Sequence, residues 1–103
     1  NNIITHNDSG GQANLYEINA STGAVLRTVA ITNATNVDWE DIAQDAFYIY
    51  IGDIGNNFGN RTNLKIYKIS KEDYDDADDT AAAEIISYSY TNQLDFYYNR
   101  RSK

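Results

Sequence analysis

Apolar and polar residues alternate along short runs of this chain, which is the pattern of half-buried β-strands. In one such run Leu15 and Glu17 fall on one face, while Tyr16 and Ile18 fall on the other. Asn, Asp, Gly, Ser and Thr separate the runs, and these residue types favour turns. The pattern predicts strands at residues 3–6, 14–18, 25–31, 37–43, 47–53, 64–69 and 85–90.

One segment is less clear, because three consecutive alanines within residues 76–86 could form a short helical turn. Asp-rich loops before strands are the more common solution. We therefore expect the acidic run Asp73–Asp79 to be a solvated loop.

The chain also repeats itself. Three pairs of segments correspond in order: Asp8-Ser9-Gly10 with Asp53-Ile54-Gly55, Leu15-Tyr16-Glu17-Ile18 with Ile66-Tyr67-Lys68-Ile69, and Ile31-Thr32-Asn33 with Tyr90-Thr91-Asn92. A repeat of roughly 40–50 residues that contains several strands is typical of propeller blades. A small β-sandwich complete within these residues is the alternative.

The fold predicted from this repeat is all-β, a β-propeller fragment of about two four-stranded antiparallel blades. The outer strands of one blade would occupy residues 1–35, a complete blade residues 36–91, and the start of the next blade residues 92–103. Both ends look like cuts within a larger protein, so we expect the remaining blades of that protein to be partners of this segment.

Composition narrows the functions. Asp and Glu number 15 against 8 Lys and Arg, which gives a formal net charge of −7. Such a surface repels nucleic-acid phosphates and anionic lipid headgroups and attracts cations. The chain has no Cys, and no apolar run approaches the roughly 20 residues of a membrane span. We expect neither a nucleic-acid partner nor a membrane span.

The acidic run Asp38-Trp39-Glu40-Asp41 is the strongest candidate for chemistry. Alternation puts Asp38 and Glu40 on one face of a strand, and in a propeller the first strand of each blade lines the central channel. Ile42 falls on the same face, so a bulge or the strand end must intervene if the carboxylates face water. Converging carboxylates suit Ca²⁺. The structural alternative is that they bind backbone amides while Trp39 packs between blades.

Other polar and aromatic residues have simpler interpretations. Asp8 and Asp53 each come two residues before a Gly, so we expect Asx-turns. His6 is the only histidine and, without Cys, builds neither a zinc site nor a triad, so we expect it to be buried and hydrogen-bonded. Most tyrosines should pack between strands, although exposed ones could stack on sugar rings, which makes a glycan a candidate partner.

A family resemblance rests on motifs in a fixed order: His6-Asn7-Asp8-Ser9-Gly10, then Asn36–Ala43, then Ile51–Asn57, followed by Leu64–Ile69. They resemble the N-terminal blades of large secreted β-propeller proteins of Bacteroidetes-type bacteria, which often carry a C-terminal sorting tail for type IX secretion. The resemblance implies a propeller fold and an extracellular or cell-surface location. It implies no particular activity.

A second resemblance is to calcium-dependent lactonase-type propellers, which place a Glu on an inner strand with an Asp or Asn downstream. Glu40 and Asp53 have a similar spacing, with Asn57 beyond. Together with Asp38, this resemblance makes Glu40, Asp53 and Asn57 the candidate metal ligands, and calcium the candidate cofactor.

Two functions follow from these observations. We expect an extracellular or cell-surface module for binding or adhesion, with a glycan or surface protein as partner and no catalysis in this segment. The alternative is part of a metal-dependent propeller hydrolase of the lactonase, esterase or phytase-like kind.

Overall fold

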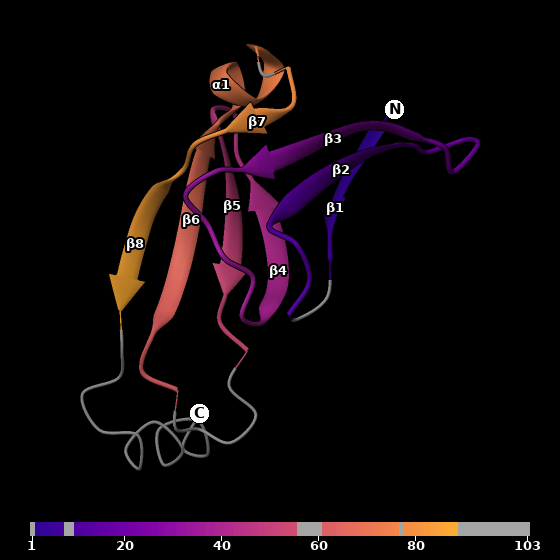
Figure 1. Ribbon diagram of the computed structural model, residues 1–103. Helices are drawn as coiled ribbons and strands as arrows, with labels where there is room; N and C mark the ends of the chain where they lie inside the picture. Colours follow the sequence, from indigo (N-terminus) through magenta and orange to yellow (C-terminus); the bar gives the residue numbers. More distant parts are fainter. Residues whose placement is uncertain (1, 8–9, 56–60, 77, 89–103) are drawn as a thin grey trace.

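The computed structural model describes residues 2–7, 10–55, 61–76 and 78–88, and it contains two four-stranded sheets (Figure 1). The first sheet has the order β1-β2-β3-β7, with β1 at Asn2–His6, β2 at Asn14–Asn19, β3 at Val25–Ile31 and β7 at Thr80–Ala81. The second sheet has the order β4-β5-β6-β8, with β4 at Trp39–Gln44, β5 at Tyr48–Asp53, β6 at Leu64–Ser70 and β8 at Glu84–Tyr88. The predicted all-β class is confirmed.

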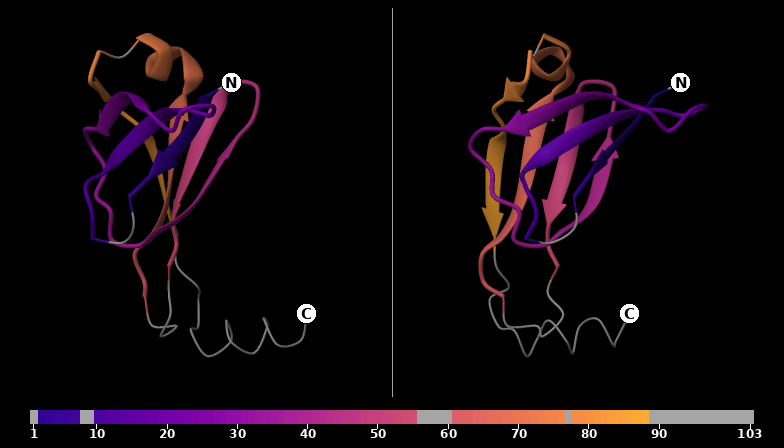
Figure 2. Two further views of the ribbon diagram at one scale, coloured as in Figure 1. Left: turned by 90° about the vertical axis from the view of Figure 1, so that its right-hand side faces the viewer. Right: turned by 45° about the vertical axis from the view of Figure 1, so that its right-hand side comes forward.

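The two sheets lie face to face, and the core fills the space between them (Figure 2). β5 shows why: Ile49 and Ile51 are buried against the first sheet, while Tyr48 and Tyr50 alternate onto the opposite face. The first sheet contributes Leu15, Val29 and Ile31 to the same core, and the second adds Trp39, Tyr67 and Ile69. Each fully buried aliphatic side chain stabilises the fold by about 1.5–3 kcal/mol.

The outer faces of both sheets carry exposed apolar residues. Ile3, Ile18 and Val25 lie in register across β1, β2 and β3, and Ile3 and Val25 are 55% and 58% exposed. On the second sheet Ile86 lies opposite Ile66 and is 42% exposed. Rows of this kind commonly mark a surface that packs against another part of a protein.

β7 departs from the predicted antiparallel pattern. It pairs with β3 in parallel, with Ala30 opposite Thr80 and Ile31 opposite Ala81. The Asn33 side chain extends this contact, because its amide donates to the Ala83 carbonyl at 2.7 Å and its oxygen accepts the Ala83 N–H at 2.9 Å. The chain therefore leaves the second sheet after β6, adds a strand to the first and returns as β8. This excursion crosses the expected blade division between residues 35 and 36.

A helix replaces part of the expected acidic loop. α1 covers Lys71–Asp76, and Ser70 caps it by accepting the Asp73 N–H at 3.0 Å. Tyr74 faces inward from α1 and is buried. The prediction of a solvated loop was wrong for residues 73–76, and the helical turn considered for residues 76–86 is wrong because Ala81 belongs to β7. In the described part of the chain, no helix is long and apolar enough to cross a membrane.

Candidate functional site

The sequence motifs gather at the lower end of the two sheets in Figure 1, where β1 ends and β4 begins. The Gly10 N–H donates to the Asn36 carbonyl and the Gly55 N–H donates to the Asp38 carbonyl, both at 3.1 Å. The buried Asn36 amide donates to the Asn7 carbonyl at 3.3 Å. Gly10 and Gly55 are thus both bonded to the loop that precedes β4.

Asp53 holds this loop through hydrogen bonds to its backbone. Its carboxylate is fully buried, lies 2.8 Å from the Arg61 guanidinium, and accepts the backbone N–H groups of Val37 and Asp38 at 3.2 and 2.8 Å. The Asx-turn prediction is wrong for Asp53, because its oxygens take amides from the neighbouring loop rather than from two residues ahead. Asp8 lies outside the described residues. A buried carboxylate needs such partners, so this geometry favours a structural role.

The candidate metal ligands are only partly assembled. Glu40 is exposed, and it lies at the register shift between Trp39 and Asp41. This shift is the bulge that was expected if the carboxylates of this strand are to face water. Asp38 is half-buried, and a Cβ added to Gly55 would overlap its carboxylate, so a larger residue at position 55 would require the Asp38 side chain to move. Asn57 lies outside the described residues, and within those described no three His, Cys, Asp or Glu side chains form a metal-binding group. Calcium binding by these residues stays a prediction.

His6 belongs to an aromatic cluster between the sheets. It is half-buried, its Nδ1 lies 2.7 Å from the Asn7 carbonyl, and its ring meets the Trp39 ring edge-on at 5.9 Å. The Trp39 indole donates to the Thr35 carbonyl at 2.9 Å. The hydrogen bond expected for His6 is present, although the side chain is less buried than expected.

A cavity of about 470 Å³ lies at the opposite end, between the start of β1, the end of β4 and α1. Its apolar lining comes from both sheets and comprises Ile4, Ile42, Ala43 and Ile49, together with Ile3, which alternates onto the outer face of the first sheet. Its polar lining comprises Asn2, Glu17, Gln44, Lys71, Tyr74 and Asp75. Ligand sites in proteins are commonly concave, mostly apolar and about 300–1,000 Å³ in size, with a few converging polar groups.

Glu17 is the most connected polar group of this cavity. One carboxylate oxygen accepts the Tyr74 hydroxyl at 3.0 Å and lies 3.6 Å from Arg27, and the other accepts the Asn2 amide at 2.7 Å. The Arg27 guanidinium also stacks on the Tyr74 ring at 4.5 Å and donates to the Tyr74 carbonyl at 2.8 Å. Burial, and then the hydrogen bond to Glu17, raise the pKa of Tyr74 to about 12. Tyr74 therefore stays protonated and donates to Glu17 at neutral pH.

The sequence interpretation missed the residues that build this cavity. Two features of the sequence pointed to them. The first is that Glu17 alternates onto the same face as the buried Leu15, where a charged residue needs a partner. The run Ser70-Lys71-Glu72-Asp73 also has the Ser-x-x-acid pattern that often begins a helix. That pattern predicts α1, and with it the positions of Lys71 and Tyr74.

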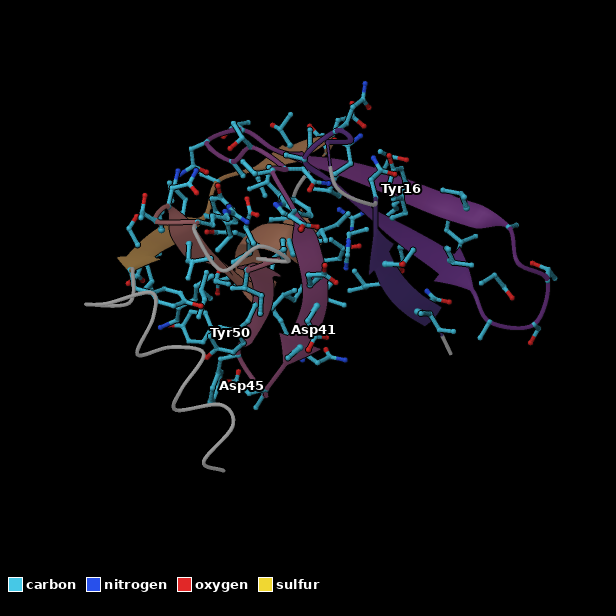
Figure 3. The ribbon with its side chains drawn as sticks, turned by 90° about the horizontal axis from the view of Figure 1, so that it is seen from below. Tyr16, Asp41, Asp45 and Tyr50 are labelled. Carbon is cyan, nitrogen blue, oxygen red and sulfur yellow. The ribbon has the colours of Figure 1, made fainter. Side chains whose placement is uncertain are left out.

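A second cluster lies on the outer face of the second sheet, around the β4–β5 hairpin (Figure 3). The Tyr50 hydroxyl donates to one Asp45 oxygen at 2.7 Å, and the other accepts the N–H groups of Phe47 and Tyr48. These hydrogen bonds lower the pKa of Asp45, and the bond from Tyr50 has the largest effect. The Lys68 ammonium lies 4.1 Å from the centre of the Tyr48 ring. The cluster fixes the hairpin and leaves an aromatic outer surface.

Comparison with known protein families, with curated proteins and with solved structures gave no match for this chain.

Proposed function

We propose that this chain forms neighbouring blades of a β-propeller that serves outside the cell as a binding or adhesion module, without catalysis in this segment. The observation that carries the proposal is the cavity between the two sheets, beside the first strand of each. The chain's ligand would bind in this cavity.

The strand order supports the assignment of blades. In each sheet the first three strands follow one another in chain order, as β1-β2-β3 and β4-β5-β6. Blades of a propeller are built this way from the axis outward, which would make β1 and β4 the innermost strands. This assignment differs from the expected division, in which residues 1–35 hold only outer strands and β1 corresponds to β5. The two sheets pack face to face, as adjacent blades do, and the apolar rows on their outer faces suit further blades.

The state of the acidic residues supports binding over catalysis. Asp53 and Glu17 already accept hydrogen bonds from backbone amides or from neighbouring side chains. A general base or nucleophile instead needs an oxygen positioned toward a reacting atom. The extracellular location follows from the motif resemblance, and the net charge of −7 suits a soluble surface that does not adhere to nucleic acid.

Methyl NMR of the full-length protein with labelled isoleucines tests this function. Ile4 and Ile42 line the cavity, whereas Ile69 is buried in the core and serves as the internal control. Small polar compounds of different charge would be added one at a time. At least one should shift the signals of Ile4 and Ile42 and leave Ile69 unchanged. Shifts confined to other sites, or none from any compound, would contradict a ligand site in the cavity.

A further inference from the structure

We infer that the cavity between β1, β4 and α1 binds one neutral, polyhydroxylated ring, the size of a single hexopyranose unit of a glycan. This inference rests on the proposed function, because it takes the cavity as the ligand site and names the chemical class that fits it.

Charges of both signs lie at the cavity: Glu17 and Asp75 are negative, and Lys71 and the adjacent Arg27 are positive. Glu17 lies 3.6 Å from Arg27. Lys71 and Asp75 are four residues apart on α1, where side chains of opposite charge are neighbours. A cationic ligand would have to compete with Arg27 for Glu17, and an anionic ligand would meet a chain of net charge −7. A neutral ligand meets neither obstacle.

The polar groups match hydroxyls. A carboxylate has about four lone-pair positions; Tyr74 and Arg27 both lie at one oxygen of Glu17, and Asn2 occupies one position on the other. Hydroxyl donors can use the remaining capacity. The side-chain amides of Asn2 and Gln44 each offer a donor and an acceptor at the cavity wall. Adjacent ring hydroxyls, which donate and accept at once, are suited to such planar amides.

The apolar wall matches the other face of such a ring. Ile4 from the first sheet and Ile42 from the second both line the cavity and are half-buried, so part of their surface is open to a ligand. The C–H faces of a pyranose are apolar and gain from burial against aliphatic side chains. The volume of about 470 Å³ lies within the range of small-molecule sites.

Isothermal titration calorimetry of the full-length protein tests the inference. The neutral probes are the methyl pyranosides of glucose, galactose, mannose and N-acetylglucosamine, and the charged probes are glucuronate, inorganic phosphate and tetramethylammonium. At least one neutral pyranoside should bind more tightly than every charged probe. The variants Glu17→Gln and Gln44→Ala should each weaken that binding by about tenfold, which is the loss expected for one hydrogen bond to a charged or amide group.

Two matched variants control for charge and fold. Glu84→Gln and Gln12→Ala change exposed residues outside the cavity and should leave the affinity unchanged. Gln44 is itself exposed, so Gln44→Ala keeps the test valid if Glu17→Gln unfolds the protein.

The outcomes separate the inference from the proposed function. Cavity-dependent binding of a charged probe in preference to the pyranosides overturns the ligand class and leaves the binding module intact. Pyranoside binding that neither cavity variant weakens overturns the site. If no probe binds and the isoleucine signals never move, both the inference and the proposed function are wrong.

Discussion

Asp53 shows how one buried carboxylate holds the loop before β4. The sequence indicated an Asp that recurs before a Gly, and the simplest explanation was a local turn. In the structure the carboxylate instead bonds Arg61 and two amides of the loop before β4. Sequence spacing cannot reveal such a partner, because the contact depends on how β4 and β5 pair in space.

Removing the Asp53 charge should be costly. Asp53→Asn leaves Arg61 facing a neutral group at a fully buried position, so we expect the free energy of unfolding to fall by about 3 kcal/mol. Denaturant unfolding measures this, with Asp78→Asn as the control at an exposed position. A loss below about 1 kcal/mol, the range of exposed ion pairs, would show that the Asp53–Arg61 pair is not a structural centre.

Tyr74 predicts a pH dependence at the alkaline end. Its pKa is raised to about 12 in the folded protein, above the ordinary tyrosine value of 10.0. The folded state therefore holds this proton where the unfolded state has lost it, and the resulting stability is complete below pH 10 and lost as the pH rises toward 12. The free energy of unfolding should fall across this window.

The Tyr74→Phe variant isolates this contribution. Its free energy of unfolding should fall less steeply between pH 10 and 12 than that of the unmodified protein. Some dependence will persist, because the hydrogen bond to Asp45 also raises the pKa of Tyr50. Equal slopes for the two proteins would mean that Tyr74 ionises normally and that its contact with Glu17 is not maintained.

At the scale of elements, strands with clear alternation were predictable, whereas β7 was not. β2, β5 and β6 lie within a residue or so of their predicted bounds, because period-two patterning reflects one buried face. β7 has only two residues and pairs in parallel with a strand about 50 positions earlier, so no local sequence pattern predicts it. The cavity escaped prediction for the same reason, since α1 and β1 meet only in the folded chain.

Ser70 should be the residue that fixes the start of α1. Its hydroxyl oxygen accepts the Asp73 N–H, and loss of such a cap costs about 1 kcal/mol. We expect Ser70→Ala to lower the free energy of unfolding by that amount. The control is Ser21→Ala in the exposed β2–β3 turn, which should change it by less than about 0.5 kcal/mol. An equal effect of both substitutions would indicate that α1 is held by Tyr74 alone.

At the scale of the whole molecule, the outer faces decide how the chain behaves by itself. Ile3 and Val25 on one side and Ile86 on the other are exposed, and within the described residues no further strand pairs with the outer edge of β8. We therefore expect the 103-residue chain, expressed alone, to aggregate or to lack a cooperative melting transition. Analytical ultracentrifugation and calorimetry measure this. A monomer that melts cooperatively would favour the two-sheet sandwich over the propeller.

An experimental structure of the full-length protein tests the propeller assignment most directly. We predict that the two sheets stack around a common axis, with β1 and β4 closest to it and with further four-stranded sheets covering the rows that contain Ile3 and Ile86. The cavity should then open near the channel between these two first strands. A closed sandwich, in which these two sheets form one complete core and their outer faces meet only solvent, would contradict the propeller and the binding role built on it.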